Sequence, residues 1–396
     1  MISGNQQADV LCITGTRADY GIYRPLLLEL NQSKTIRLSL IVTGMHLLHE
    51  YGNTIDEVRE DSLEIMGTPS ILVKGDSPSS MSQSLGLALL YFSQIFEQIK
   101  PKSILLLGDR GEMLAAAITA HYQNIPIFHL HGGEVSGSAD DLVRHAISKF
   151  SHIHFVSSIR SKQHLIAMGE EEWRIIPVGS LRKHDIEQLR QWDQQTKELM
   201  SEKYQLHPNK KKILFVMHPD SKAKHSFAEQ IDEALSSLEN LHDVQIFILG
   251  SNSDAGGEVF ARRIQQFAQE HQASYFHSIP ATDYLFFLSK VDLLMGNSSS
   301  GMIEAPFFSL PVINIGQRQR NREQGRNVIN VDYDRQKITQ AIQGVLTGKG
   351  AKDSSQNPSG NPYDLGFMPA TEIIQRIEAL LKNPEMMNKR MVLNNG

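Results

Sequence analysis

The chain has 396 residues, of which 40% are hydrophobic and 21% are charged, a composition typical of globular proteins with an ample core. Its formal net charge of −5 argues against a broad surface for nucleic acid or acidic membranes, and no apolar stretch approaches the ~20 residues needed to span a bilayer. The single cysteine, Cys12, excludes a disulfide within the chain and, with no recognisable signal peptide, favours a cytoplasmic protein.

The first predicted strand, Asp9–Thr14, leads into a glycine-bounded loop and then into a helix. The start of a helix exposes backbone N–H groups that can bind an anion, so this loop is a candidate phosphate site. Arg17 in the loop serves either such a phosphate or a structural ion pair, and we favour the phosphate. Cys12, inside the strand, is interpreted as a small buried hydrophobic residue.

The next elements carry less chemical information. A predicted strand at Ile36–Thr43 is followed by His46 and His49, but nothing nearby completes a metal site, and we expect no metal. We interpret residues 57–80, which are polar and contain Gly, Pro and Ser, as a mobile connection, and Met81–Ile99 as a long helix.

The most informative stretch holds two apolar runs in succession, the first ending in Asp109 and the second in His131 and Glu134. Such runs are typical of buried parallel strands, and ligands bind at the carboxyl edge of such sheets. Asp140 and Arg144 follow at the start of the next predicted helix. We therefore predict that these five residues share one sheet edge, with the three carboxylates and the histidine as catalytic candidates.

Each of these residues also has a structural interpretation. Asp109 is a suitable cap for the helix that follows, His131 is compatible with a satisfied core histidine, and the glycines beside it suit a tight turn. The functional interpretation rests on the cluster, because several proton-handling side chains follow strand ends together.

Strands and helices keep alternating along the chain, which predicts an α/β fold with mostly parallel sheets. Further strands are expected at Ser103–Leu107, Ile125–Leu130, Ile153–Ser157, Ile175–Val178, Ile213–Met217, Val244–Leu249, near Tyr275, Val291–Met295 and Leu310–Ile315. Further helices are expected at Glu112–Tyr122, Asp140–Phe150, Phe227–Leu238, Glu258–His271 and Thr282–Ser289, and from Gly301 onward.

Two successive series of similar size predict two Rossmann-like domains that face a cleft. We expect residues 1–185 to form the N-terminal domain and residues 186–369 the C-terminal domain, with a helix and a charged interdomain connection over Leu181–Lys212. Residues 348–362 are interpreted as a flexible loop. The last segment, residues 370–396, contains a helix that we expect to pack back on the N-terminal domain.

In the second domain, one strand is followed by a run of small polar residues and a predicted helix. Small residues let a backbone approach a ligand, and their N–H groups and hydroxyls can hold a diphosphate. We assign Asn297, Ser298 and Ser299 to this role. Glu304, about one turn later, is placed to accept hydrogen bonds from a ribose. The alternative is a helix cap without a ligand.

Two further segments support a nucleotide site. His218 follows a predicted strand, and Arg318 and Arg322 belong to a basic loop after another strand. Arginines there would neutralise a diphosphate. Arg320 of the same loop is equally well explained as solvated surface charge.

Taken in order, these motifs resemble those of the hydrolysing UDP-N-acetylglucosamine 2-epimerases of sialic-acid-type sugar synthesis. The resemblance rests on the segments GTRADYG, TGMHL, LLLGDR, HLHGGE, DDLVRHAI, HPDS, GNSSSGMIEAP and RQRNRE, which extend along nearly the whole chain. It implies the two-domain glycosyltransferase-B architecture, with the nucleotide held mainly by the C-terminal domain. It also implies conversion of UDP-N-acetylglucosamine and water to N-acetylmannosamine and UDP, without a cofactor. The expected partners are the UDP-sugar and further copies of the chain in a dimer or tetramer.

The reaction that the resemblance implies passes through a 2-acetamidoglycal. A proton leaves the sugar C2 while UDP leaves C1, then water adds at C1 and a proton returns to C2 on the opposite face. By resemblance, Asp109, Asp140 and His131 are the acid and base candidates, and Glu134 and Arg144 orient them. The residues implied to hold the diphosphate and nucleoside are Arg17, His218, Ser298, Ser299, Glu304 and Arg318.

The chain departs from the family pattern at two places. His131 stands where members that act on UDP-N-acetylglucosamine often have glutamate. The changed charge points to an alternative substrate, UDP-2,4-diacetamido-2,4,6-trideoxyglucose, on a legionaminic-acid route. The segment Asn361–Gly366 also differs from the usual Tyr-Gly-Asp-Gly. A glycosyltransferase of the same architecture and a nucleotide-sugar sensor without catalysis are further alternatives, although the crowded acid/base cluster favours elimination chemistry.

Overall fold

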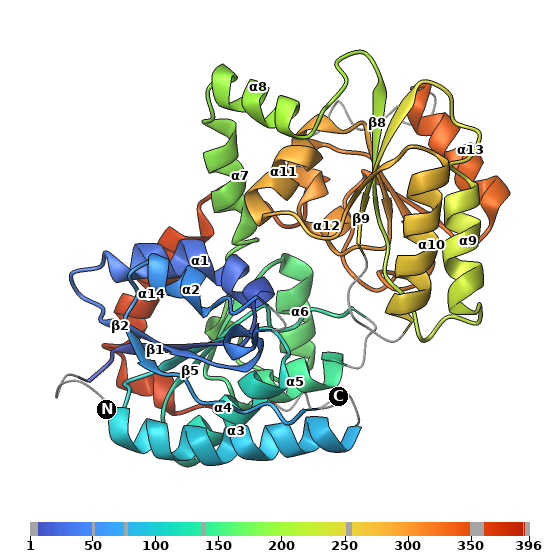
Figure 1. Cartoon of the computed structure of the whole chain (residues 1–396). Coiled ribbons are helices and arrows are strands. Elements are labelled where there is room, and N and C mark those ends of the chain that lie inside the picture. The colour runs from blue at the N-terminus through green and yellow to red at the C-terminus, as the bar shows by residue number, and fades with distance from the viewer. Residues whose placement is uncertain are drawn as a thin grey trace. The chain divides into compact units, whose positions relative to one another are not determined.

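A computed structural model describes residues 7–49, 52–74, 78–136, 140–250, 256–348, 360–390 and 392 (Figure 1). The chain divides into two compact units. Unit 1 comprises Met1–His184 and Leu365–Gly396, and unit 2 comprises Asp185–Asp364. The chain therefore passes from one unit to the other twice, and its last segment belongs with its first.

Unit 1 is built on a parallel sheet that has seven strands within the described residues, in the order β3-β2-β1-β4-β5-β6-β7. The strands are β1 (Val10–Thr14), β2 (Leu38–Val42), β3 (Ile65–Gly67), β4 (Ile104–Leu107), β5 (Ile127–Leu130), β6 (Ile153–Val156) and β7 (Ile175–Pro177). The strand order reverses between β1 and β4, so the crevice favoured by ligands lies at the carboxyl ends of those two strands.

Helices cover both faces of this sheet, which is why its central strands are continuous Val/Ile/Leu runs rather than alternating ones. Cys12 faces the core under α1, α2 and α14, while its neighbour Ile13 faces the core under α3 and α4. The helices of unit 1 are α1 (Arg17–Asn31), α2 (Ile55–Glu60), α3 (Pro78–Ile99), α4 (Gly111–Tyr122), α5 (Asp140–Phe150), α6 (Ile159–Ala167) and α14 (Pro369–Leu380), with short 3-10 turns η1 (Gly44–Leu47), η3 (Glu172–Arg174) and η6 (Pro384–Met387). The boundary to unit 2 falls inside α7 (Arg182–Arg190).

Unit 2 has a second parallel sheet, with six strands among the described residues in the order β10-β9-β8-β11-β12-β13. Its strands are β8 (Lys211–Val216), β9 (Val244–Leu249), β10 (Ser274–Phe276), β11 (Leu293–Gly296), β12 (Val312–Ile315) and β13 (Val328–Val331). Its other elements are α8 (Gln194–Lys203), α9 (Phe227–Ser236), α10 (Gly257–Glu270), α11 (Ala281–Lys290), α12 (Ser300–Ile303), η4 (Ala305–Phe308) and α13 (Arg335–Leu346). The order reverses between β8 and β11, the counterpart of the β1/β4 crevice.

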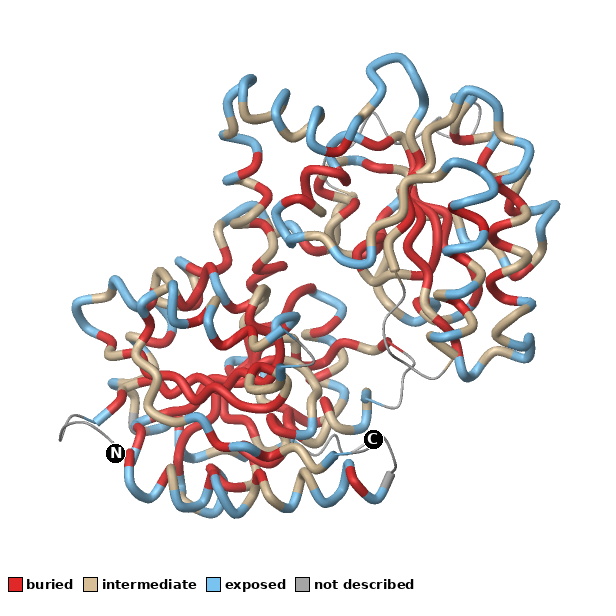
Figure 2. The backbone as a smooth tube through the Cα atoms, viewed as in Figure 1, coloured by how far each residue is buried: buried red, intermediate tan, exposed pale blue. Residues whose placement is uncertain are grey.

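Each unit has its own cores. Figure 2 shows the buried backbone concentrated in the strands of each sheet and exposed backbone on the helices around them. In unit 2 one core lies under α9, α10 and α13 and the other under α11 and η4. The predicted α/β fold of two Rossmann-like domains is thus confirmed by two separate parallel sheets, each covered by helices.

Helix α14, in the last segment of the chain, packs against α1, the first helix. Its apolar residues Ala370, Ile373 and Ile377 are buried in the same core as Leu27 and Leu30 of α1. Their spacing of three and four residues places them on one helix face. Because α14 belongs to unit 1, residues that are distant in sequence complete the core of that unit.

The described part of residues 57–80, which we interpreted as a mobile connection, contains regular secondary structure. It includes the end of α2 and the strand β3, which pairs with β2 at the sheet edge. Its polar composition misled the prediction because β3 is only three residues long and half-buried, so it lacks the apolar run of a central strand. Helix α6, strand β13 and helix α13 were not predicted from the sequence. Most of the predicted loop over residues 348–362 lies outside the described residues.

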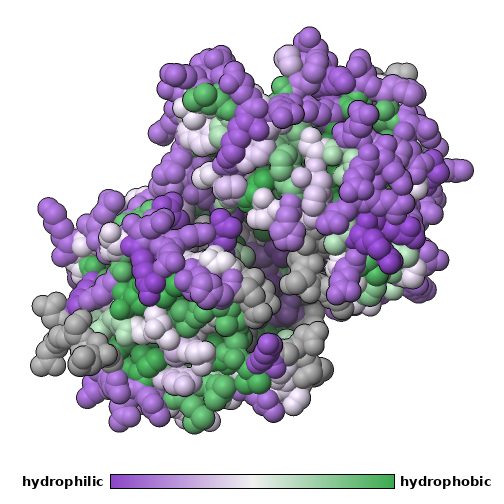
Figure 3. Space-filling model, in the orientation of Figure 1, coloured by the Kyte–Doolittle hydropathy of each residue, from purple (hydrophilic) through white to green (hydrophobic). Residues whose placement is uncertain are grey.

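Several large apolar side chains of unit 1 are exposed. Met81 and Leu90 on α3 keep 69% and 63% of their surface exposed, and Tyr122 at the end of α4 keeps 80%. Figure 3 shows apolar side chains gathered over this part of the unit. Among the described helices, none combines the length and the apolar character that a membrane crossing requires.

Candidate active site

Arg144 joins the polar residues at the carboxyl edge of the unit 1 sheet. It lies on α5 with only 6% of its side chain exposed. Its Nη1 donates to the Glu134 carbonyl at 2.9 Å and to the Asp141 carboxylate at 2.7 Å, and its Nη2 donates to the Asp109 carboxylate. A buried guanidinium with these partners fixes the spacing of three chain segments. The structure thus brings Asp109, Glu134 and Arg144 together.

Asp109 follows β4 and does not cap the next helix, because the cap position of α4 is Arg110 and Asp109 pairs with Arg144 instead. Burial raises the pKa of the Asp109 carboxyl above its ordinary value of 3.8. The negative charges of Asp140 and Glu134 raise it further, against the opposing charge of Arg144. A carboxyl with a raised pKa exchanges a proton more readily near neutral pH, as general acid–base catalysis requires.

His131 has a strained backbone. Its φ of +62° lies in the left-handed region, which is unfavourable for a residue with a side chain and recurs at functional sites. Its ring Nδ1 lies 3.4 Å from Glu134 Oε1, and that oxygen also accepts a hydrogen bond from the Ser157 hydroxyl at 2.7 Å. The imidazole keeps 15% of its surface exposed, its Nε2 is buried, and the buried carboxylate of Glu134 orients the ring through Nδ1.

The loop after β1 differs from the expected anion cradle. The buried Asp19 carboxylate accepts hydrogen bonds from the N–H groups of Gly15 and Thr16, both at 3.1 Å, so these two groups are already used. Arg17, the first residue of α1, is half-exposed and pairs with Glu57 at 3.0 Å. An exposed ion pair of this kind is weak and exchanges easily for a ligand. The candidate anion contact of this loop is therefore the guanidinium rather than the backbone.

Asp19 belongs to a buried polar network that also holds His46. Burial and the charge of Glu112 raise the pKa of Asp19 to about 6, and burial lowers the pKa of His46 to about 4. The two nitrogens of His46 lie 3.0 Å from the Thr14 hydroxyl and 2.8 Å from the Thr54 hydroxyl. His46 is therefore a neutral residue that ties β1 to the segment before α2.

In unit 2, Asn297 holds the loop after β8. Its side-chain oxygen accepts from the His218 N–H at 2.8 Å, and its side-chain nitrogen donates to the His218 carbonyl at 2.8 Å. Asn297 is completely buried, and the exchange joins the ends of β8 and β11. His218 is thus fixed at the carboxyl edge by a residue that we had assigned to the ligand itself.

The small residues after β11 form a compact hydroxyl cluster. The Ser300 hydroxyl donates to the Ser298 hydroxyl at 2.9 Å and contacts the Tyr284 hydroxyl. Ser299 is the cap residue that precedes α12, and α12 is a single turn, so its helix dipole is weak. Glu304 stands where α12 passes into η4, about one turn after the serines.

The basic loop after β12 folds back on the same point. Arg318 and Gln319 both donate to the Asn297 carbonyl at 3.2 Å, and Arg322 donates to the Gln319 side chain at 3.1 Å. Arg318 and Arg322 are half-buried, whereas Arg320 is exposed. His218, Asn297 and Arg318 are therefore gathered at the carboxyl ends of β8, β11 and β12.

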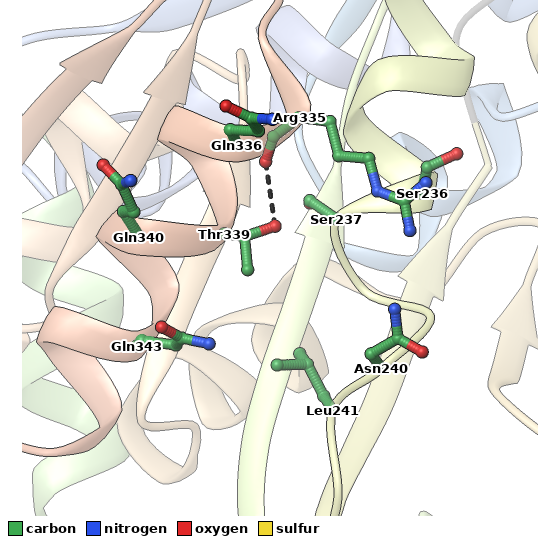
Figure 4. A pocket seen from close by; sticks show the side chains of 9 residues that line it. All are labelled: Ser236, Ser237, Asn240, Leu241, Arg335, Gln336, Thr339, Gln340 and Gln343. Carbon is green, nitrogen blue, oxygen red and sulfur yellow. Dashed lines mark hydrogen bonds between the residues drawn. The ribbon is translucent and has the colours of Figure 1, made fainter.

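A separate groove lies in unit 2 between α9 and α13, with a volume of about 490 Å³ (Figure 4). Most of the side chains that line it carry amides or hydroxyls, and its Arg335 pairs with Glu239 at 3.1 Å. None of the predicted site residues lines this groove. Among the described residues, no group of three or more His, Cys, Asp or Glu side chains is placed to hold a metal ion.

Several residues of these clusters were not predicted from the sequence. Asp141 binds Arg144 and accepts from the Ser136 N–H at 3.0 Å, and its place in the Asp-Asp pair was the available signal. Asp19 closes a capping box with Thr16, a spacing that is visible in the sequence. His129 and Gln319 gave no signal, because one lies inside an apolar strand and the other in a polar loop.

Comparison with known proteins gives consistent matches. The profile of a family described as UDP-N-acetylglucosamine 2-epimerase matches residues 28–378. The chain is 43% identical, over 332 residues, to a Legionella pneumophila protein named UDP-N,N'-diacetylbacillosamine 2-epimerase (hydrolyzing), covering 82% of this chain and 86% of that protein. It is 32% identical, over 380 residues, to the UDP-N-acetylglucosamine 2-epimerase of Neisseria meningitidis serogroup B, covering 96% of each.

The fold also has solved counterparts. The crystal structure of UDP-GlcNAc 2-epimerase from Neisseria meningitidis bound to UDP-GlcNAc matches with a TM-score of 0.78 at 20% identity. The match covers 94% of this chain and all of that one. At this identity the likeness concerns the two-domain architecture.

Proposed function

Since the chain belongs to the UDP-N-acetylglucosamine 2-epimerase family, we propose that it hydrolyses a UDP-2-acetamidosugar with inversion at C2. The products are UDP and the free 2-epimer. The observation that carries this proposal is the cluster at the unit 1 sheet edge, where Arg144 holds Asp109 beside Glu134, and Glu134 faces His131. Such a set of proton-handling groups is more than binding alone requires.

The proposed reaction has two stages. In the first, a base takes the C2 proton, the C1–O bond breaks, and UDP leaves with the bonding electrons to give a 2-acetamidoglycal. In the second, water adds at C1 and gives up a proton to a base, while an acid returns a proton to C2 on the opposite face. We assign these proton transfers to Asp109 and His131, with Asp140 as a further acid/base candidate and with Glu134 and Arg144 orienting them. Each step is a proton transfer, the departure of UDP or the addition of water, so we propose neither a cofactor nor a metal.

Unit 2 is proposed to bind the nucleotide. His218 and Arg318 would stabilise the negative charge that grows on the diphosphate as it leaves, with Arg322 beside them. Ser298 and Ser299 would donate hydroxyl hydrogen bonds, and Asn297 positions His218. Glu304 is proposed to accept hydrogen bonds from the ribose. Arg17 of unit 1, whose ion pair is exposed, would also bind the diphosphate.

We propose UDP-N,N'-diacetylbacillosamine, that is, UDP-2,4-diacetamido-2,4,6-trideoxyglucose, as the substrate. The relative of that name is 43% identical to this chain, whereas the relative named for UDP-N-acetylglucosamine is 32% identical. His131, where the family often has glutamate, also favours a modified sugar, because it alters the charge beside the ring. The product is then a 2,4-diacetamido-2,4,6-trideoxymannose, suited to a legionaminic-type route.

UDP-N-acetylglucosamine is the second candidate, since the Neisseria meningitidis relative matches across 96% of both chains. A panel of the two UDP-sugars, incubated with the protein alone in heavy water enriched in ¹⁸O, separates the possibilities. The proposal expects UDP, deuterium at C2 and ¹⁸O at C1 of the free sugar, with the higher kcat/KM for the diacetamido sugar. Turnover that requires an acceptor would identify a glycosyltransferase instead, and binding without turnover would identify a sensor.

We also propose that the protein acts in the cytoplasm, where UDP-sugars are made, as a dimer or tetramer. The exposed apolar side chains Met81 and Leu90 of α3 are a suitable surface for a second copy. Light scattering of the wild type and of Leu90→Asp tests this, since a monomer in both would contradict it.

A further inference from the structure

A buried histidine links helix α5 to the turn that carries Asp109. His129 lies on β5 and is completely buried. Its Nε2 lies 2.8 Å from the Gly108 carbonyl, and its Nδ1 lies 3.2 Å from the Ser148 hydroxyl of α5. Gly108 immediately precedes Asp109 and has a φ of +74°, so the imidazole contacts the turn that directs Asp109 out of the sheet.

The direction of these hydrogen bonds follows from the charge of the ring. Burial lowers the pKa of His129 to about 3, so the imidazole is neutral and has one donor and one acceptor. A carbonyl only accepts, so Nε2 carries the hydrogen and donates to Gly108. Nδ1 must then accept, and the Ser148 hydroxyl donates to it. The result is a chain from Ser148 through His129 to Gly108 in which every bond has a defined direction.

This series of hydrogen bonds is the second of two connections between α5 and the turn after β4. The first is the ion pair of Arg144 with Asp109. Ser148 is four residues after Arg144, so both side chains project from the same face of α5. One connection holds the carboxylate itself, and the other holds the backbone just before it. Because one contact is with the Asp109 side chain and the other with the Gly108 carbonyl, together they fix both the position and the orientation of the turn.

Gly132 leaves the space for this arrangement. A Cβ at residue 132 would lie 2.9 Å from His129 Nδ1 and 3.0 Å from Ser148 Oγ, closer than side-chain carbons normally approach. Any larger residue would therefore push the imidazole or the hydroxyl out of place. The first glycine of the His-Gly-Gly-Glu motif is thus explained by the hydrogen-bond chain beside it.

We propose that His129 and Ser148 are positioning residues that act through Asp109 and set its distance from the substrate. This inference rests on the proposed function, in which Asp109 handles the C2 proton. Neither residue touches the sugar in the proposal. Their effect is on geometry, and a misplacement of about 1 Å at a reacting group can cost roughly 10²-fold in rate.

The test begins with His129→Leu, which keeps the bulk but removes both ring nitrogens. We expect kcat to fall by roughly 10–100-fold, while the affinity for UDP, measured by calorimetry, stays unchanged. His129→Gln restores a donor toward Gly108 and should recover most of the rate, and Ser148→Ala should give a smaller loss than His129→Leu. The matched control is His154→Leu. His154 lies on β6, where it pairs in register with His129 of β5, and it is equally buried. Its side chain contacts Glu170 and not the turn that carries Asp109. It should lower stability and leave kcat intact.

A combined variant decides whether His129 acts through Asp109. If it does, Asp109→Asn with His129→Leu is no slower than Asp109→Asn alone. The inference is overturned if His129→Leu slows both backgrounds by the same factor, or if His154→Leu lowers kcat equally. A readout without turnover is the ¹³C resonance of the Asp109 carboxyl, whose titration should move in His129→Leu and not in His154→Leu. If the wild type hydrolyses no UDP-sugar, the proposed function fails, and the carboxyl titration still decides the positioning.

Discussion

Asp109 differs from an ordinary surface aspartate because its surroundings act on the pKa of its carboxyl in opposite directions. Burial and two neighbouring carboxylates raise the pKa of its side chain, while Arg144 keeps that carboxyl hydrogen-bonded and in place. A group in this balance can change its protonation state without leaving its position. This combination is what a proton-transfer residue needs, and it arises where the turn after β4, the loop after β5 and helix α5 meet.

Asp109→Asn tests this role directly. The amide keeps the size of the side chain but cannot act as a base, so kcat should fall by roughly 10²–10⁴-fold. The nucleotide site is proposed to lie in unit 2, and the affinity for UDP should therefore stay unchanged. Steady-state kinetics and calorimetry measure the two effects. Full activity in a folded variant would assign the proton transfer to another residue.

Glu304→Ala tests the nucleotide site. The ribose would lose a charged acceptor worth about 1.5–3 kcal/mol, so UDP should bind roughly 10–100-fold more weakly by calorimetry. Arg320→Ala is the control, because Arg320 belongs to the neighbouring basic loop but is exposed. Equal UDP affinity in the wild type and in Glu304→Ala would remove Glu304 from the proposed ribose contact.

At the scale of elements, the segment after α14 binds the C-terminal end of α5 and holds it in place. Lys389 donates to the carbonyls of Ser148 at 3.2 Å and Ser151 at 2.6 Å, beside the C-terminus of the helix. It also pairs with Glu170 at 2.7 Å, and Glu170 lies 3.2 Å from His154. A cation at this end of a helix is favourable because the helix dipole is negative there. Helix α5 is therefore held at the site by Arg144 and at its other end by Lys389.

Glu170 makes this fastening sensitive to acid. Burial alone would raise the pKa of its carboxyl, but His154 and Lys389 outweigh burial and bring the pKa to about 2, below the ordinary 4.5. Because the folded pKa is the lower one, the contribution to stability is present above about pH 4.5 and is lost as the pH falls toward 2. Chemical unfolding from pH 7 to pH 3 should show Glu170→Gln as less stable at pH 7, with the difference shrinking in acid.

The control for this prediction is Glu172→Gln. Glu172 also pairs with a lysine, but 70% of its side chain is exposed, so its removal should change stability little at any pH. A pH-independent difference between the wild type and Glu170→Gln would contradict the proposed role of the charge.

Strands with a strong hydrophobic pattern could be predicted from the sequence, whereas individual side-chain contacts and short elements could not. The apolar runs ending in Asp109 and His131 gave the strands and their common edge, because parallel strands end side by side. Arg144 was predicted near that edge, but its contact with Asp141 was not, because the prediction singled out the neighbouring Asp140 of the same Asp-Asp pair. His129 was invisible because a polar residue within an apolar strand has no distinct pattern. Strand β3 was missed because an edge strand of three residues is too short to show one.

At the scale of the whole molecule, the two units have separate cores, and that of unit 1 depends on α14. Ile377→Ala should remove buried methyl groups from this core and lower its stability by about 2–5 kcal/mol. Ile374→Ala, on the same helix but partly exposed, should cost less. Thermal unfolding followed by calorimetry measures both variants. UDP binding should survive in each, since the proposed nucleotide residues of unit 2 lie in the other core.

Because α14 comes from the far end of the chain, the protein has a built-in order of assembly during translation. Residues 185–364 are contiguous, so unit 2 can fold as soon as they leave the ribosome. Unit 1 has to wait, since Ile373 and Ile377 belong to its core but are synthesised after all of unit 2. A nascent chain stalled shortly after unit 2 has emerged would therefore gain the proposed nucleotide-binding half before the proposed proton-transfer half is complete.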